Sequence, residues 1–206
     1  MNLEERRKLF LRVFRKAERK YGNRVKRLSA EGWNKPWQTL IATMLSAQSR
    51  DEVTIPVAEE LFRKYPTLEE LSGASQSDVL EAIRSINFNR TKARNITVTA
   101  RLLKARHKGC VPDSMEVLLS LPGVGRKTAN LVLSEVYGQE TITIDTHCHR
   151  ILNVLGIVKT RTPNQTETEM EKIAPRIYWK RINRLFVLWG KDCPGKDKKK
   201  LLSGLD

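Results

Sequence analysis

The sequence predicts an all-α protein built from many short helices. Apolar residues recur at three- and four-residue intervals in almost every segment, which places them on one face of a helix. Polar pairs such as Thr67 with Glu70 are typical of helix starts. The nearest approach to a strand is the alternation over residues 141–144, which is too short to found a sheet. We therefore expect about eight to ten helices joined by short turns.

The apolar stripes locate these helices in chain order. Their members are Leu9, Phe10, Val13, Phe14 and Ala17; Trp37, Leu40, Ile41, Met44 and Leu45; Val57, Ala58, Leu61 and Phe62; Val79, Leu80, Ile83 and Ile86; Ile96, Leu102 and Leu103; and Ile182, Leu185, Phe186 and Trp189. Asp113 with Glu116 predicts a further helix start, and Gly190 predicts a helix end. Periodicity alone does not say how the helices divide into lobes.

The composition indicates an anionic partner. The chain of 206 residues carries 38 lysines and arginines against 23 aspartates and glutamates, a formal net charge of +15. A surplus of this size gives sequence-independent affinity for phosphates, so nucleic acid is the favoured partner. An anionic membrane surface and a merely basic protein are the alternatives.

Targeting and redox signals favour a cytoplasmic, nucleoid-associated protein. No apolar run reaches the roughly 20 residues of a membrane span, so no membrane partner is expected. Residues 1–16 are charged and helical in period, unlike a signal peptide. Cys110, Cys148 and Cys193 are widely spaced without a CxxC pair, so neither a disulfide framework nor a zinc site is predicted.

The segment 116–130, EVLLSLPGVGRKTAN, reads as a helix, a tight turn and a second helix. Pro122 ends the first helix, and Gly123 and Gly125 let the backbone turn sharply and approach a ligand, because no Cβ intervenes. The amides that open the second helix form an anion site. A plain packing corner is the alternative, but the Arg-Lys pair that follows the glycines favours a bound phosphate.

Lys127 is the candidate nucleophile because it lies in the first turn of the second hairpin helix. The positive end of that helix and the neighbouring Arg126 disfavour an ammonium there, and partial burial would add to this effect. An uncharged amine can attack a sugar carbon, whereas an ammonium can only contact phosphate. The residues by themselves leave these two roles equally open.

Asp145 lies in the segment 143–150, TIDTHCHR, and is expected to cap the helix that follows it. A carboxylate held there can also stabilise positive charge on a sugar and take a proton from an amine. His147 and His149 are two residues apart, but no third ligand is evident, so no metal site is predicted. Both histidines are expected in phosphate contacts or structural hydrogen bonds.

The hairpin, Lys127 and Asp145 together resemble the endonuclease III family of DNA glycosylases. The hairpin is similar almost residue for residue, and the two side chains, eighteen positions apart, match the family's catalytic pair in type, local motif and spacing. The resemblance implies base excision DNA repair by an enzyme that is both a glycosylase and an AP lyase, since glycosylases that only remove the base usually carry another residue at the lysine position. It also implies DNA-binding roles for Leu121, Gly123, Val124, Gly125, Arg126, Thr128 and His147.

Two more segments resemble the elements with which this family fills the gap left by an extruded nucleotide. Residues 45–51, LSAQSRD, match its S-A-Q-x-x-D motif and imply that Gln48 occupies the vacated space. In residues 86–93, INFNRTKA, Phe88 fits the apolar wedge that stacks on an unpaired base, with core packing as the alternative. Relatives usually have glycine where Asn87 stands, and asparagine tolerates the left-handed backbone that a glycine there would adopt.

The resemblance covers roughly residues 30–193. It implies the helix-hairpin-helix glycosylase fold, with two helical lobes and a DNA-binding cleft between them. One lobe of six helices, residues 29–139, would carry the hairpin and Lys127. The other would join residues 1–28 to residues 140–206 and carry Asp145.

The C-terminal segment departs from the family pattern. Most relatives bind a 4Fe–4S cluster through four closely spaced cysteines near the C-terminus. Here Cys193 alone stands near those positions, so we expect no cluster and no other cofactor. Leu201, Leu202 and Leu205 are expected to fold back on the second lobe instead.

The expected partner is double-stranded DNA that contains damaged bases or abasic sites, bound by a monomer. Oxidised pyrimidines such as thymine glycol are the favoured substrates because the family's main branch acts on them. Uracil or thymine opposite guanine and 8-oxoguanine are the alternatives. Two other functions are a non-catalytic module that uses the hairpin only for phosphate contact and a basic helical scaffold for protein partners.

Overall fold

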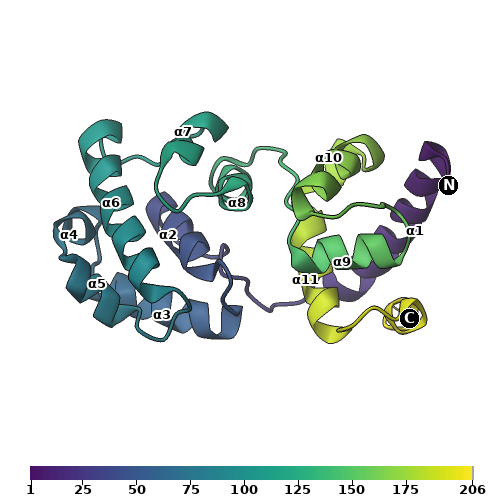
Figure 1. The fold of residues 1–206 in the computed structure, drawn as a ribbon, viewed down its shortest axis with the longest axis horizontal. Helices are drawn as coiled ribbons and strands as arrows, with labels where there is room; N and C mark the ends of the chain where they lie inside the picture. The colour runs from purple at the N-terminus through teal and green to yellow at the C-terminus, as the bar shows by residue number, and fades with distance from the viewer. Residues whose placement is uncertain (206) are drawn as a thin grey trace. The chain divides into compact units, whose positions relative to one another are not determined.

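The computed structural model describes residues 1–205, and its regular structure in that range is entirely helical. The chain forms two compact units, residues 27–139 and residues 1–26 with 140–206 (Figure 1). The predicted all-α class is therefore confirmed. None of the helices in the described range is both long and apolar enough to cross a membrane.

The described residues form twelve α-helices and one 3-10 helix, more than the eight to ten expected. Those without a predicted stripe or start are α10 (Pro163–Ile173), η1 (Arg176–Tyr178) and α12 (Lys198–Ser203). The buried face of α10 carries Thr166 and Glu167 beside Met170 and Ile173, so it shows no clear apolar period. Helices α4 (Leu68–Gly73) and α5 (Gln76–Ala82) are short but were both predicted. Thr67 does cap α4 in the predicted pairing with Glu70, and Ser75 caps α5 directly afterwards.

The unit formed by residues 27–139 contains seven helices, α2 to α8, whereas the resemblance implied six for residues 29–139. Besides α4 and α5, they are α2 (Pro36–Ser46), α3 (Asp51–Lys64), α6 (Asn89–His107), α7 (Met115–Ser120) and α8 (Arg126–Tyr137). Helices α3, α6 and α8 all pack on α2, and α4 and α5 pack on α6 (Figure 1).

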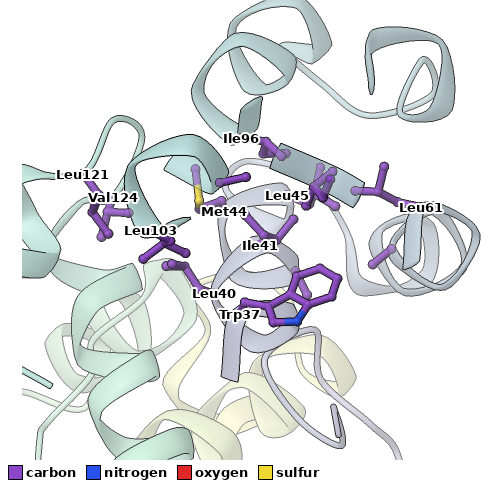
Figure 2. Close-up of a cluster of buried hydrophobic side chains, with 14 of the residues drawn as sticks. Trp37, Leu40, Ile41, Met44, Leu45, Leu61, Ile96, Leu103, Leu121 and Val124 are labelled. Atoms are coloured by element: carbon purple, nitrogen blue, oxygen red, sulfur yellow. The ribbon is translucent and has the colours of Figure 1, made fainter. Parts of the chain in front are cut away.

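Helix α2 is the centre of this unit. Between Trp37 and Leu45 every side chain except that of Gln38 is buried. A helix that is apolar on all sides requires neighbours on all sides. Figure 2 shows how they surround it: α2 contributes Trp37, Leu40, Ile41, Met44 and Leu45, and the neighbouring segments contribute Leu61, Ile96, Leu103, Leu121 and Val124.

The other unit joins both ends of the chain. Its helices are α1 (Leu3–Tyr21), α9 (Thr146–Val154), α10 (Pro163–Ile173), the 3-10 helix η1 (Arg176–Tyr178), α11 (Trp179–Asp192) and α12 (Lys198–Ser203). Helix α1 packs on α10 and α11, and α9 packs on the same two helices. The ring of Phe14 on α1 lies 4.7 Å from that of Tyr178, which ties the N-terminal helix to the C-terminal half of the unit.

Two predicted helix boundaries are wrong. Helix α7 begins after Ser114, which makes no side-chain cap hydrogen bond, so Asp113 does not pair with Glu116 as a capping box. Gly190 lies inside α11 rather than at its end. A Cβ added to Gly190 would come within 2.7 Å of the His147 Cβ, so this glycine is required where α9 and α11 approach most closely.

Candidate functional site

The hairpin between α7 and α8 is a tight turn anchored to the core. The amide of Val124 donates to the carbonyl of Leu121 at 3.1 Å and closes the turn, and Thr99 Oγ1 on α6 donates to the carbonyl of Pro122 at 3.0 Å. Leu121 and Val124 are 3% and 6% exposed and belong to the hydrophobic core around α2 (Figure 2). Their side chains therefore hold the turn in place, and a ligand can reach these two residues only through the backbone.

The fold requires only one of the two hairpin glycines. Gly123 has a φ of 80°, and an added Cβ would lie 2.8 Å from Asn95 Nδ2 and 2.9 Å from Asn95 Cβ. Both the left-handed backbone and the packing against α6 therefore demand glycine. Gly125 has a φ of −94°, which any residue adopts, and an added Cβ would meet nothing within 4 Å. Space is left at Gly125 for the close approach of a ligand.

The first turn of α8 is suited to hold an anion. Gly125 is the N-cap residue and has no side chain that could accept from the first-turn amides, and no acidic residue lies in that turn. Arg126 and Lys127 are exposed there, while Thr128 is buried. The helix start thus offers backbone amides beside two positive side chains.

Lys127 is exposed in the first turn of α8. The buried positions of α8 are Thr128, Ala129, Asn130, Val132 and Leu133. Residue 127 precedes this stripe by one position and therefore points away from the core of its own unit. Its amine is accessible to a substrate, and the rigid hairpin fixes the position of its backbone.

Asp145 belongs to the other unit, where it caps α9 as the sequence predicts. Its Oδ1 accepts from the backbone amide of Cys148 at 2.8 Å, and the side chain is 9% exposed. Ile142 and Ile144, which precede it, are buried and fix the approach of the chain to the helix. The carboxylate is held rigidly while one oxygen serves the cap, so capping and a catalytic role are compatible.

The two histidines of α9 occupy different environments. His149 Nδ1 lies 2.6 Å from Thr166 Oγ1 on α10, and burial lowers the pKa of its imidazole. This supports a structural role. His147 is half-buried, with its ring against the backbone of Gly190 on α11, which leaves one part of the imidazole accessible. Within residues 1–205 no group of three or more metal-binding side chains is close enough to hold an ion.

Gln48 and Phe88 are exposed on the unit formed by residues 27–139. Gln48 lies in the turn between α2 and α3, and Phe88, which precedes α6, is 64% exposed. The alternative that Phe88 packs in the core is therefore wrong. So is the expectation that Asn87 takes the left-handed backbone, because Phe88 adopts it at a φ of 57°.

Lys92 is a residue that the sequence analysis missed. It lies on the buried face of α6 in register with Ile96 and Leu103, and its Nζ donates to oxygens of the turn that carries Gln48. The signal was present in the sequence, because helical periodicity places this lysine at a core position. A charged residue at such a position must satisfy its hydrogen bonds locally.

The C-terminal segment does not fit an iron–sulfur cluster. Cys193 is buried, and a Cβ added to Gly204 would overlap its Sγ, so the thiol packs against the chain at the end of α12. A 4Fe–4S cluster takes four cysteine ligands, whereas Cys110 and Cys148, the other cysteines of the chain, lie far from Cys193 in the sequence.

Apolar contacts and hydrogen bonds close this segment instead. Leu201 and Leu205 are buried as expected, whereas Leu202 is only half-buried. Trp189 Nε1 donates to the carbonyl of Leu201 at 3.1 Å. Arg150 Nη2 donates to the carbonyls of Gly190 and Cys193 at 3.0 and 3.2 Å.

Comparison with known proteins identifies the class. Residues 41–176 match the family model described as "HhH-GPD superfamily base excision DNA repair protein". The endonuclease III of Thermotoga maritima is 44% identical over 156 residues, which cover 76% of this chain and 73% of that protein. The endonuclease III of Synechocystis sp. is 38% identical over 157 residues, with 76% and 72% covered.

Comparison with solved structures indicates the same family. The structure entitled "Structure of a Trapped Endonuclease III-DNA Covalent Intermediate: Estranged-Adenine Complex" is similar with a TM-score of 0.85 at 29% identity, and 96% of this chain and 90% of that chain are covered. Fold and sequence thus define a DNA-binding protein of base excision repair. Within that class, the chain belongs to the endonuclease III family. It is an enzyme with DNA glycosylase and AP lyase activities, so the alternatives of a non-catalytic module and a protein scaffold are set aside.

The two glycines give a matched pair of variants. We expect Gly123→Ala to lower the free energy of unfolding by about 1–3 kcal/mol, because the new Cβ strains the backbone and meets Asn95. Gly125→Ala should change it by less than about 1 kcal/mol, but should weaken duplex binding by roughly fivefold, the equivalent of one hydrogen bond to phosphate. Urea unfolding and fluorescence anisotropy with labelled duplex measure the two effects. Parental affinity in Gly125→Ala would show that no ligand approaches the turn closely.

Proposed function

We propose that this glycosylase and AP lyase removes oxidised pyrimidines from double-stranded DNA, with Lys127 as the nucleophile and Asp145 as the carboxylate that assists it. The observation that carries the proposal is the position of Lys127, which is exposed in the first turn of α8, two residues after the Gly125 that caps the helix. The same turn that grips a phosphate backbone therefore presents an amine.

The chemistry needs an uncharged amine and a nearby acceptor for its proton. The Lys127 nitrogen forms a bond to the sugar C1′ while the glycosidic bond breaks and the base departs. Opening of the sugar ring leaves a Schiff base between the lysine and C1′. Loss of a proton from C2′ then expels the 3′ phosphate by β-elimination, and water releases the lysine.

Asp145 has two tasks in this scheme. Its carboxylate stabilises the positive charge that develops on the sugar, and it can take the proton that the amine loses. The cap hydrogen bond from the Cys148 amide supports these tasks because it fixes the carboxylate before the substrate arrives.

The hairpin and the exposed side chains divide the DNA contacts between them. We assign phosphate contact to the backbone around Gly123 and Gly125 and to the Arg126 side chain, with His147 as a further contact. Leu121, Val124 and Thr128 are buried, and this supports contact only through their backbone atoms. Gln48 and Phe88 are assigned to the gap left by the extruded nucleotide, since both side chains are exposed.

The substrate assignment rests on the family's main branch. Uracil or thymine opposite guanine and 8-oxoguanine are the competing substrates on the same fold. We further propose that the enzyme acts as a monomer on the chromosome in the cytoplasm, drawn there by its net charge of +15. We also propose that it holds no iron–sulfur cluster, because one buried cysteine packed against α12 supplies too few ligands.

Borohydride trapping tests the nucleophile. With thymine glycol in a duplex, the parent protein should give a covalent protein–DNA adduct, and Lys127→Ala should give none, because the Schiff base that borohydride reduces cannot form. Lys64→Ala, which removes another exposed lysine of the same unit, should trap as the parent does. Running the assay over a panel of lesions, with and without alkali, reports substrate and lyase activity together. An undiminished adduct in Lys127→Ala would remove the lysine from the mechanism.

The variant Asp145→Asn keeps the helix cap and removes the negative charge, so it tests the catalytic role of the carboxylate alone. Asparagine keeps an oxygen that accepts from the Cys148 amide, so the free energy of unfolding should change by less than about 0.5 kcal/mol. The rate of base excision should fall by roughly 100-fold or more, because the negative charge is lost. Single-turnover excision and thermal unfolding are the measurements. Parental excision by this variant would contradict the role of the carboxylate.

Iron analysis tests the missing cluster. Protein purified from iron-replete cells should be colourless and contain far less than one iron atom per chain. Cys193→Ala should leave the visible spectrum unchanged. A brown protein with about four iron atoms per chain, the content of a 4Fe–4S cluster, would show that the C-terminal segment rearranges to hold one.

A further inference from the structure

Two exposed side chains of the unit formed by residues 27–139 are presented by strained backbone. Gln48 and Phe88 have φ values of 54° and 57°, and among residues 1–205 only Lys108 shares this left-handed conformation without being glycine. For a residue with a Cβ this conformation costs about 1–2 kcal/mol. Strain of this kind persists only where surrounding contacts hold it.

Lys92 supplies contacts on both sides of Gln48. Its Nζ donates to the carbonyls of Leu45 and Ala47 at 2.7 and 2.6 Å and to Ser49 Oγ at 3.2 Å. Leu45 and Ala47 lie at the end of α2 and directly before Gln48, and Ser49 follows it. One side chain from α6 therefore spans the whole turn.

Burial of the Lys92 ammonium costs free energy. Lys92 is 8% exposed, and burial lowers its pKa to about 8. A buried charged group is tolerated when its donors are satisfied, as they are here by three neutral oxygens. An apolar residue would suit this core position better if the turn did not need to be held.

Asn87 makes the second connection. Its Nδ2 donates to the carbonyl of Gln48 at 2.7 Å, although its side chain is exposed. A glycine at this position would have no group that could make this bond. Because Phe88 follows Asn87 directly, the bond also ties the backbone of the exposed ring to the backbone of Gln48.

We propose that Asn87 and Lys92 are positioning residues that hold Gln48 and Phe88 together as one preformed wedge for opening the duplex. The inference rests on the proposed role of Gln48 and Phe88 in the vacated space. Preorganisation removes the entropy that two separate flexible side chains would lose on entering the stack. Neither Asn87 nor Lys92 needs to touch the DNA in this role.

The test separates opening of the duplex from the chemistry that follows. Asn87→Ala removes one donor from an exposed residue, and Lys92→Met removes the ammonium while keeping most of the stem. Each should lower the single-turnover rate of base excision by about three- to tenfold, the equivalent of one hydrogen bond. Cleavage at a preformed abasic site, which has no base to extrude, should stay within about twofold of the parent rate.

A fluorescent 2-aminopurine next to the lesion reports unstacking directly, and its increase on binding should be smaller in both variants. Thr91→Ala, which changes an exposed residue of the same helix, should behave as the parent in all three assays. Thermal unfolding accompanies each variant. If Lys92→Met does not fold, Asn87→Ala alone decides the outcome.

Gln48→Ala and Phe88→Ala distinguish the possible failures. If these two slow excision while Asn87→Ala and folded Lys92→Met match the parent, the positioning role is wrong and the wedge stands. If neither Gln48→Ala nor Phe88→Ala slows excision, the wedge itself is wrong, and the positioning role falls with it. Equal losses of base excision and abasic-site cleavage in Asn87→Ala would also overturn the positioning role, because they would indicate a general structural defect.

Discussion

The burial of α2 on all sides is the constraint on which the unit of residues 27–139 depends. Because this helix exposes almost no surface, α3, α6 and α8 must each lie against it. Each segment of this unit that is assigned to DNA adjoins α2, α6 or α8. The hairpin is anchored by Leu121 and Val124 in the same core, and α2 runs directly into the turn that carries Gln48 (Figure 2). The rigid core thus fixes two turns at the surface, the hairpin and the turn that carries Gln48.

The segments of this unit that we assign to DNA contact include residues in unusual backbone conformations, which a few side chains hold. Gly123 is fixed by its packing on α6, and the strained residues Gln48 and Phe88 are joined by hydrogen bonds from Asn87 and Lys92. Left-handed backbone is costly for a residue with a side chain, and two of the three such residues in this unit, Gln48 and Phe88, lie at positions assigned to the base stack. Packing of the surrounding helices in the core offsets the cost of this backbone, because it holds the turns in one conformation.

The second unit differs in how its C-terminal segment is held in place. A metal cluster would organise such a segment through strong bonds to cysteine. Here Leu201 and Leu205 are buried, Trp189 donates to a carbonyl of α12, and Arg150 holds the chain after α11. Arg150 lies on α9, the helix capped by Asp145, so the same helix supports both the carboxylate and the end of the chain.

The sequence by itself determined the helical class, the hairpin and the cap at Asp145, because each depends on local spacing or local backbone chemistry. The pairing of Lys127 with Asp145 came from the resemblance to the endonuclease III family. Only the tertiary structure decided the rest. It exposed Lys127 and Phe88, moved the left-handed residue from position 87 to 88, and placed Gly190 inside α11 against His147. It also brought Lys92 to the carbonyls beside Gln48, a contact between residues more than forty positions apart. Such contacts depend on how the helices pack, and a period of apolar residues shows which face of a helix is buried but not which neighbour covers it.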